Sequence, residues 1–336
     1  MTDTSTPTPT STAASSVDLI LQVRDLSKTF PVKGGVLSRI IGGVKAVDGV
    51  SLDIHRDEVF GLVGESGCGK TTLGRMILRL IEPSGGRIFF DGIDITDLDR
   101  HRMRVFRKRM QIIFQDPFGS LNPRKTIDSI VGEPLRIAGL TGTEVREKVQ
   151  EMIELVGLAP DSVGRYPHEF SGGQRQRIGI ARAIILHPEF LVADEPVSAL
   201  DVSIQAQILN LLMALKGHLS FTMFFISHDL RVVRSICDRV AVMYLGRVVE
   251  EGKVEELYQR PVHPYTEELI RAIPEPDPEL SIRGDGLPGE VPSPMNPPPG
   301  CAFHPRCPLA KDICRQHTPE LTERAGEGHR AACHLR

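Results

Sequence analysis

The sequence predicts an α/β fold in which a parallel sheet presents a phosphate-binding loop, and two observations lead to this expectation. Residues 64–72 read GESGCGKTT and fit the pattern G-x-x-x-x-G-K-[ST] of such a loop. An apolar segment of strand length, residues 59–63, precedes the loop, and apolar residues at helical spacing follow it over residues 73–81. Strand, glycine-rich loop and helix in this order are the context that the motif requires.

The residue types in the loop suit a polyphosphate that carries a magnesium ion. Glycines let the backbone approach the anion closely, so that N–H groups and the start of the following helix face the phosphates. Lys70 is expected to reach the β- and γ-phosphates, and the Thr71 hydroxyl is expected to hold Mg²⁺. The predicted nucleotide-binding residues of the loop are Gly64, Glu65, Ser66, Gly67, Cys68, Gly69, Lys70, Thr71 and Thr72.

The composition is that of a globular protein without a general affinity for nucleic acid. The chain has 336 residues, enough for about two domains, and 40% of them are hydrophobic. With 40 basic and 43 acidic residues the net charge is −3, which indicates no nucleic-acid partner. No uncharged apolar run approaches the roughly 20 residues of a membrane span. The Ser/Thr/Pro-rich residues 1–16 are expected to form a disordered tail and not a signal peptide.

Two strands of an antiparallel piece are predicted before the loop, over residues 19–30 and 44–54. Residues 31–43 between them form an insertion punctuated by glycines. Phe30 ends the first strand, where an aromatic ring either belongs to the core or stacks on a purine base. The residues alone leave both interpretations of Phe30 open.

Beyond the loop, the basic residues 100–109 are predicted to form a solvated helix face. The strand that follows, residues 110–114, ends at Gln115, whose amide can reach a metal ion or a water at the site. Residues 126–157 have no β-rich stretch and predict two helices that break near residues 139–142. They are expected to form a helical lobe inserted into the α/β core.

A second helix start suited to an anion follows this lobe. Ser171 is a candidate N-cap, and Gly172 and Gly173 leave the N–H groups of the first turn open. Gln174 follows them, before a helix predicted over residues 178–186. If this start served only as a cap, two adjacent glycines would lower the helix propensity without a benefit.

Two further apolar strands end in residues with catalytic chemistry. Residues 190–193 lead into Asp194, placed to hold Mg²⁺ through water, and Glu195, a candidate base for the attacking water. The strand at residues 221–226 leads to His228, at the carboxyl end where open α/β sheets place their ligands. Asp201 precedes a helix predicted over residues 203–215.

Together these motifs resemble the nucleotide-binding subunits of ABC transporters, in order and spacing, from about residue 19 to residue 252. The matching positions are Phe30 for the A-loop, residues 64–71 for Walker A, Gln115 for the Q-loop, residues 171–174 for the signature motif, residues 190–195 for Walker B, residues 198–201 for the D-loop and His228 for the switch histidine. The resemblance favours base stacking by Phe30. It also implies that Gln115 senses Mg²⁺ and that Asp201 lies near the nucleotide.

Two positions depart from the usual family pattern. Phe170 stands where the signature motif commonly begins with Leu, and residues 56–58 replace a more usual Gly-Glu before the core strand. Neither change removes a chemical group, so we expect a competent ATPase site. A cassette that binds ATP without hydrolysing it would lack the glutamate or the histidine, and Glu195 and His228 are both present.

The end of the chain resembles the C-terminal extension of oligopeptide and dipeptide importers, over residues 260–274, 287–292 and 300–308. Relatives that import nickel, glutathione or opines carry the same extension. The expected organisation is therefore an ABC ATPase cassette over residues 17–252, with its helical subdomain at about residues 117–172. An importer-type extension is expected over residues 253–336.

The resemblance implies an ATP-hydrolysing motor for the uptake of dipeptides and oligopeptides, at the cytoplasmic face of the membrane. Two such cassettes pair head to tail, and each ATP lies between Walker A of one and the signature helix of the other. The expected partners are a related, non-identical cassette, two membrane-spanning permease subunits and, indirectly, an extracytoplasmic receptor. The alternatives are the same motor for nickel, glutathione or opines, or a soluble ABC ATPase that acts on nucleic acid or ribosomes. The soluble class typically has two fused cassettes or coiled-coil insertions, which this sequence lacks.

Four of the six cysteines lie after residue 300, namely Cys301, Cys307, Cys314 and Cys333. Their spacing is C-x5-C-x6-C-x18-C, in a Pro-rich segment with little apolar content for a core of its own. A bound metal can supply the folding free energy of such a segment, whereas disulfides do not suit the cytosol. Zinc sites usually show ligand pairs about two to four residues apart, and four thiolates on loops also suit a 4Fe–4S cluster.

Members of the importer family that this tail resembles carry a 4Fe–4S cluster, so the cluster is expected ahead of zinc. Four histidines remain as spare ligands for zinc: His304, His317, His329 and His334. Free surface cysteines are the third alternative. The expected cofactors are thus ATP, Mg²⁺ and a 4Fe–4S cluster, with Zn²⁺ in its place as the alternative.

Overall fold

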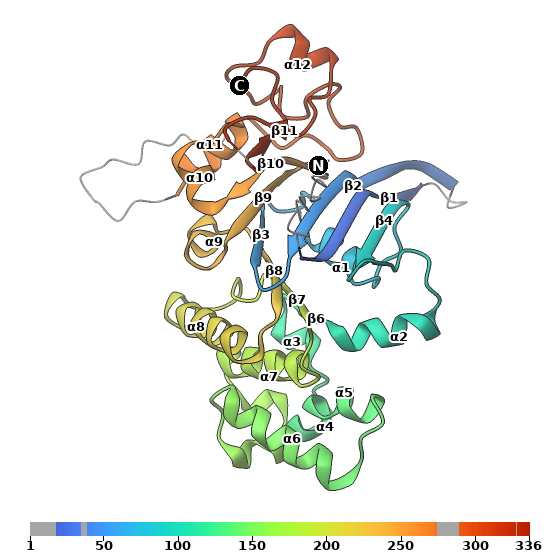
Figure 1. The fold of residues 1–336 in the computed structure, drawn as a ribbon, viewed down its shortest axis with the longest axis vertical. Helices are drawn as coiled ribbons and strands as arrows, with labels where there is room; N and C mark the ends of the chain where they lie inside the picture. Colours follow the sequence, from blue (N-terminus) through green and yellow to red (C-terminus); the bar gives the residue numbers. More distant parts are fainter. Residues whose placement is uncertain (1–17, 35–38, 274–288, 327) are drawn as a thin grey trace, which may run out of the picture.

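The computed structural model describes residues 18–34, 39–273, 289–326 and 328–336 (Figure 1). The tail predicted over residues 1–16 lies outside these ranges. The chain forms two β-sheets, with helices packed around the larger one and a helical lobe at the lower end of the view in Figure 1.

The smaller sheet is antiparallel, with the strand order β2-β1-β4-β5. Its strands are β1 (Leu19–Gly34), β2 (Arg39–His55), β4 (Gly85–Phe90) and β5 (Ile93–Asp94). The pairing of β1 with β2 continues past Phe30 through Pro31–Gly43 and Val32–Gly42. Much of the predicted insertion therefore extends the hairpin, and Phe30 lies within a strand, not at its end.

The larger sheet has the order β11-β12-β10-β9-β3-β8-β7-β6. Its strands are β3 (Val59–Val63), β6 (Met110–Ile113), β7 (Phe190–Asp194), β8 (Thr222–Ser227), β9 (Arg239–Tyr244), β10 (Arg247–Lys253), β11 (Thr322–Glu323) and β12 (Arg330–Ala331). The five strands from β9 to β6 are parallel, and every residue of β3 and β7 is buried. Strands that are covered on both faces have continuous apolar sequences. Strands β3 and β7 could therefore be predicted from their apolar runs.

Successive residues of the parallel strands enter two different cores. Phe60 and Phe224 face a core shared with the antiparallel sheet and helix α1 (Lys70–Ile77). Val59 and Phe225 face the opposite core, which includes the helical lobe. This alternation is the period of two that a β-strand imposes on its side chains. The phosphate-binding loop follows β3 and thus emerges from the junction of both cores.

The helices of the cassette follow the predicted order. They are α1, α2 (Arg100–Arg109), α3 (Pro117–Ser120), α4 (Ile127–Val131), α5 (Glu133–Ile137), α6 (Gly142–Leu155), α7 (Gly172–Ile184), α8 (Val202–Leu219) and α9 (Leu230–Ile236), with 3₁₀ turns at Pro160–Gly164 and Pro167–Glu169. The first predicted helix of the lobe is divided into α4 and α5. Pro134 lies in the first turn of α5, where its missing N–H is tolerated, whereas a continuous helix would need that donor.

The C-terminal residues extend the sheet of the cassette. Helices α10 (Val254–Gln259) and α11 (Pro264–Arg271) follow β10, and α12 (Asp312–Gln316) lies farther along the chain. Strand β12 pairs with β10, where Glu250 lies opposite Ala331 and Glu251 lies opposite Arg330. The end of the chain therefore joins the same sheet as the phosphate-binding loop.

A buried carboxylate fixes this connection. Glu250 is fully buried and accepts hydrogen bonds from the backbone N–H groups of Val262 and His263, at 2.7 and 2.9 Å. Its third bond comes from His329 Nε2, at 2.8 Å. Buried carboxylates require such partners, so these contacts hold residues on both sides of the C-terminal segment against β10. No helix within the described ranges is long and apolar enough to cross a membrane.

Candidate nucleotide-binding site

Two glycines of the phosphate-binding loop are required by close approach to the rest of the chain. Gly64 has φ +155°, and a Cβ atom there would lie 2.2 Å from the carbonyl oxygen of Met243. Gly69 has φ +110°, and its Cβ would lie 2.0 Å from the carbonyl oxygen of Ala46. Any side chain at either position would displace β9 or β2 from the loop. The loop is thus held in shape between the two sheets.

Lys70 begins helix α1 with its side chain folded back over the loop. The residue is 4% exposed, and Nζ donates to the carbonyl oxygens of Gly64 at 2.7 Å and Glu65 at 3.0 Å. These bonds place the ammonium group at the centre of the loop. A phosphate bound to the loop would therefore meet a positive charge that is already in position.

A hollow of about 200 Å³ opens above the loop. It is lined by Val44, Lys45, Ala46, Ser66, Gly67, Cys68, Gly69, Lys70, Thr71, Thr72, Gln115, Glu195, Leu245, Gly246 and Pro294. The lining includes every predicted loop residue except Gly64 and Glu65. It also includes Gln115 and Glu195, which follow the ends of two strands. Pro294 comes from the C-terminal segment, which no sequence motif connected with the nucleotide.

Two oxygen groups beside the loop fit a magnesium ion. Thr71 Oγ1 donates to Asp194 Oδ1 at 2.8 Å. Asp194 is 1% exposed, and its Oδ2 has no hydrogen-bond partner among the described residues. Burial raises the pKa of Asp194, and the bond from Thr71 opposes that shift. A buried carboxylate oxygen without a partner, next to a hydroxyl, offers the hard oxygen ligands that Mg²⁺ prefers.

Three predicted catalytic residues meet at the carboxyl ends of three strands. Glu195 Oε2 accepts a hydrogen bond from Gln115 Nε2 at 2.9 Å and lies 3.2 Å from His228 Nδ1. The Glu195 side chain is 13% exposed, whereas that of His228 is 55% exposed. Glu195 also adopts φ +45°, a left-handed conformation that is uncommon for a non-glycine residue. Glu195 lines the hollow.

Phe30 lies beside the hollow, outside its lining. It pairs with Val44 across the β1–β2 hairpin, and Val44 does line the hollow. The ring is 38% exposed, and Lys28 Nζ lies 5.3 Å from its centroid. The structure therefore excludes the core interpretation of Phe30. It leaves a ring face available near the loop.

The second predicted anion site, at the start of α7, is capped by its own chain. The Ser171 hydroxyl accepts from the Gln174 N–H at 3.4 Å, and the Gln174 side chain accepts from the Ser171 N–H at 2.9 Å. Gly172 and Gly173 keep first-turn N–H groups that have no partner inside the helix. None of these residues lines the hollow above Lys70, and neither does Asp201, the exposed N-cap residue of α8.

The two glycines of this helix start differ in what surrounds them. A Cβ on Gly173 would lie 2.6 Å from Cγ2 of Ile204, so close packing of α7 on α8 requires glycine there. A Cβ on Gly172 would lie 3.5 Å from Cδ2 of Leu200, an ordinary contact. Packing thus accounts for Gly173 alone. No contact within this chain explains why residue 172 is a glycine.

The predicted 4Fe–4S cluster is wrong, and so is its zinc alternative. Within the described ranges, which include all four late cysteines, no three His, Cys, Asp or Glu side chains are placed to hold a metal ion. Burial is the largest cause that raises the pKa of Cys301 to about 11, and it also raises the pKa of Cys307. Two of the spare histidines bond elsewhere, His329 to Glu250 and His334 to the carbonyl oxygen of His317.

The prediction assumed a segment without a core, whereas the Pro-rich segment shares the core of the cassette through Phe303. Phe303 is 1% exposed and lies edge-on to Tyr244 of β9, with centroids 5.4 Å apart. It also packs on Tyr265 of α11, at 5.4 Å. The low apolar content of the segment predicts no core of its own, but Phe303 enters the core that the cassette already forms.

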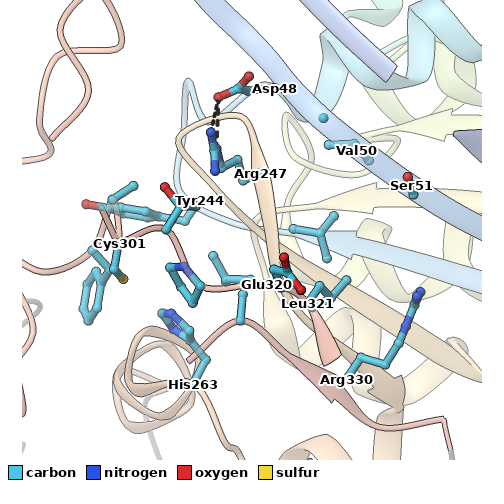
Figure 2. Close-up of a pocket in the computed structure, with 18 of the residues that line it drawn as sticks. Asp48, Val50, Ser51, Tyr244, Arg247, His263, Cys301, Glu320, Leu321 and Arg330 are labelled. Carbon is cyan, nitrogen blue, oxygen red and sulfur yellow. Dashed lines mark hydrogen bonds and ion pairs between the residues drawn. The ribbon is translucent and has the colours of Figure 1, made fainter. Parts of the chain in front are cut away.

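A second hollow, of about 500 Å³, lies between the antiparallel sheet and the C-terminal segment (Figure 2). Its two arginines are already engaged. Arg247 bonds Asp48 Oδ2 with both Nε and Nη2, at 2.9 and 2.7 Å, and Arg330 pairs with Glu251. The phosphate-binding motifs lie at the first hollow, so the nucleotide is assigned there.

Sequence reasoning missed five residues of the cassette that line the first hollow, namely Val44, Lys45, Ala46, Leu245 and Gly246, and three residues of the C-terminal segment. These three are Pro294, Tyr265 and Arg306; the last two bond to Glu65 in the loop. Tyr265 and Arg306 belong to stretches that marked the importer family. That signal identified the extension without indicating contact with the loop.

Comparisons with known proteins identify the family of the chain. The family described as "ABC transporter" matches residues 47–198, and the family described as "Oligopeptide/dipeptide transporter, C-terminal region" matches residues 249–314. The chain is 53% identical to the oligopeptide transport ATP-binding protein AppF of Bacillus subtilis, over 96% of this chain and 99% of that protein. It is 56% identical to a putative peptide import ATP-binding protein of Brucella ovis, over 94% and 97%.

Two solved structures share the fold. The ATP-binding cassette MJ0796, a dimer in a post-hydrolysis state bound to ADP and Pi, has a TM-score of 0.62 and 29% identity, over 70% of this chain and 98% of that one. The cbiO1 protein from Clostridium perfringens, part of the ABC transporter complex cbiONQ, has a TM-score of 0.62 and 30% identity, over 72% and 92%.

Proposed function

The chain belongs to the ATP-binding subunits of oligopeptide and dipeptide ABC transporters, and on this premise we propose that it is the ATP-hydrolysing motor of a peptide importer. The observation that carries the proposal is the convergence of Gln115, Glu195 and His228 beside the loop that holds Lys70. A nucleotide-binding subunit without hydrolytic activity would not need a carboxylate held in this position.

Each residue of the site has a distinct task in hydrolysis. Lys70 and the loop N–H groups bind the β- and γ-phosphates, which places the γ-phosphate in front of Glu195. Glu195 accepts the proton of the attacking water, and His228 supports the γ-phosphate. Mg²⁺, held by Thr71, Asp194 and Gln115, would neutralise charge on the phosphates. The bond from Gln115 to Glu195 orients the carboxylate and connects it with the helical lobe that follows Gln115 in the chain.

The start of α7 serves an ATP bound to a second cassette. Ser171, Gly172, Gly173 and Gln174 lie outside the hollow of their own chain, and so does Asp201. A head-to-tail pair would bring these donors to the phosphates held by the partner. The dimeric MJ0796 cassette supports such an arrangement. ATP then favours the closed pair because the γ-phosphate binds both subunits, and hydrolysis removes that preference.

The assembly around this motor consists of a second cassette, two membrane-spanning permeases and an extracytoplasmic receptor that delivers the cargo. The partner cassette is a related, non-identical chain. The motor is peripheral at the cytoplasmic face of the membrane, and the cargo is dipeptides and oligopeptides. The names of relatives that are 53% and 56% identical to this chain support the peptide assignment. Within the chain, residues 17–252 form the cassette, with the helical subdomain at about residues 117–172, and residues 253–336 form the extension.

The test is ATP hydrolysis by the transporter purified from membranes with its bound subunits and reconstituted into vesicles. Receptor loaded with oligopeptide should stimulate hydrolysis, and the Lys70→Ala variant should bind no nucleotide. Receptors loaded with nickel or glutathione serve as controls for cargo. Stimulation by one of these in place of peptide would contradict the peptide assignment. If the wild-type transporter without receptor hydrolysed ATP no faster than the Glu195→Gln variant, the proposed role as an ATP-hydrolysing motor would be contradicted.

A further inference from the structure

The C-terminal extension reaches the phosphate-binding loop through Arg306. Its Nη1 and Nη2 atoms bond the two carboxylate oxygens of Glu65, at 2.8 and 3.0 Å. The Arg306 side chain is 4% exposed and that of Glu65 is 23% exposed. Two parallel charge-assisted bonds in a largely buried setting fix direction as well as distance. Arg306 therefore determines where the Glu65 side chain lies.

Aromatic rings hold the guanidinium group of Arg306 in place. Its Cζ lies 5.9 Å from the centroid of Tyr244 and 6.0 Å from that of Phe303, and Nη1 lies 3.5 Å from the Tyr244 hydroxyl. Phe303 also lines the second hollow, as does Tyr244, which is labelled in Figure 2. The rings restrict the side chain to one direction, toward the loop.

The backbone of Glu65 is fixed by the extension as well. Its N–H donates to the hydroxyl of Tyr265, at 2.9 Å. Tyr265 is fully buried in α11, and burial raises the pKa of its phenol, so the group stays neutral. Its ring packs on Tyr244, with centroids 4.7 Å apart. The same aromatic cluster thus supports both contacts with Glu65.

The remaining polar group of Glu65 connects these contacts with the phosphate-binding lysine. The carbonyl oxygen of Glu65 accepts from Lys70 Nζ at 3.0 Å and from the Cys68 N–H at 3.3 Å. Glu65 is thus held at its side chain, its N–H and its carbonyl, one residue before the part of the loop that lines the hollow. A shift of Glu65 would move the groups that meet the phosphates.

We propose that Arg306 and Tyr265 are positioning residues for nucleotide binding, through which the extension preorganises the phosphate-binding loop of its own chain. The inference rests on the proposed function, because it names what sets the affinity of the same site. Loss of the contacts that Arg306 and Tyr265 make with Glu65 lowers the affinity for nucleotide, whereas loss of an attachment elsewhere on the extension does not. The extension is therefore part of the nucleotide site, not an appendage.

A second ion pair distinguishes positioning from simple attachment. Arg330 of β12 pairs with Glu251 of β10, so it too joins the extension to the cassette through an arginine and a glutamate. Glu251 lies in a strand, away from the loop. Loss of Arg330 should loosen the extension without moving Glu65, which makes Arg330→Met the matched control for Arg306→Met.

The experiment is calorimetric titration of the full chain with MgADP, with unfolding temperatures measured alongside. Arg306→Met should weaken binding about tenfold, equivalent to about 1.4 kcal/mol, and Arg306→Lys should restore part of the loss. Glu65→Gln should weaken binding similarly, and the double variant should lose no more than Arg306→Met alone, because both act through one contact. Arg330→Met should lower the unfolding temperature but leave the affinity within twofold of wild type.

In the reconstituted transporter, Arg306→Met should raise KM for ATP and leave kcat within twofold, because Glu195, Gln115 and His228 are unchanged. If Arg306→Met does not fold, Tyr265→Phe and Glu65→Gln provide the same test. The inference would be overturned if the folded Arg306→Met, Tyr265→Phe and Glu65→Gln variants bound nucleotide with wild-type affinity. It would also be overturned if Arg330→Met lost as much affinity as they do. If Lys70→Ala abolishes binding in the same series, the proposed function stands regardless. A wild-type chain that binds no nucleotide would overturn both.

Discussion

The two anion-binding helix starts, at Lys70 of α1 and at Gly172 of α7, use similar residue types but differ in what surrounds them. The start of α1 faces a hollow lined by the loop, by two catalytic side chains and by Pro294 of the extension. The start of α7 is only half-buried at its glycines and is capped by its own Ser171 and Gln174. The start of α1 faces an open hollow lined by its own chain, whereas the start of α7 lies outside that hollow. This difference supports the proposal that the chain takes part in two nucleotide sites.

The largest expected effect is at the α1 site. Glu195→Gln should leave MgATP binding intact and lower turnover by about 10²–10⁴-fold, the usual contribution of a general base. The amide cannot accept the proton of water, although it keeps the shape of the side chain. The measurement is steady-state hydrolysis in the reconstituted transporter, with nucleotide binding as the control. A rate within twofold of wild type would contradict the assignment of Glu195.

A smaller effect separates the two glycines of the α7 start. Gly173→Ala should destabilise the chain by about 1–3 kcal/mol because its Cβ would overpack against Ile204. Gly172→Ala has room beside Leu200 and should change the free energy of unfolding by less than about 0.5 kcal/mol. Denaturant titration of the two variants checks the contrast. Equal destabilisation by the two substitutions would mean that packing explains both glycines. It would argue against a role of Gly172 at the nucleotide of a second cassette.

The smallest effect concerns the base side of the α1 site. Phe30→Ala should weaken ATP binding by about threefold to tenfold, because a stacking contact contributes roughly 0.5–1.5 kcal/mol. Phe30→Tyr keeps the ring and should bind as wild type does. Titration with MgATP and with Mg-tripolyphosphate separates the contribution of the base. An equal loss of affinity for both ligands would show that Phe30 supports the fold and not the nucleotide base.

Most of the cassette was predictable because its signals are local. The loop glycines, the apolar strand β7 and the acidic pair that follows it are contiguous in the sequence, and their chemistry depends on short-range geometry. The meeting of Gln115, Glu195 and His228 could also be expected, since all three follow parallel strands and therefore lie at one edge of the sheet.

The extension was less predictable because its contacts are distant in sequence. Arg306 and Glu65 are 241 positions apart, and only the fold brings them together. The cluster prediction failed for a related reason. The spacing of Cys301, Cys307 and their neighbours does not determine where the thiols point, and it cannot reveal that Phe303 anchors the segment in an existing core. The composition of a segment shows that it has few apolar residues for a core of its own. It does not show that one of its residues can pack into a core formed by another part of the chain.

Photolabelling can show whether the two helix starts of one chain serve two different nucleotides. The assembled transporter would carry Gly172→Asp in this chain and a wild-type partner cassette, with Gly172→Ala as the control. Labelling by an azido-ATP analogue would be measured on each cassette separately. The account predicts that the aspartate, a negative charge placed before the partner's phosphates, reduces labelling at the partner site and leaves the Lys70 site of its own chain intact. Loss of labelling at its own Lys70 site, with the partner unaffected, would contradict the claim.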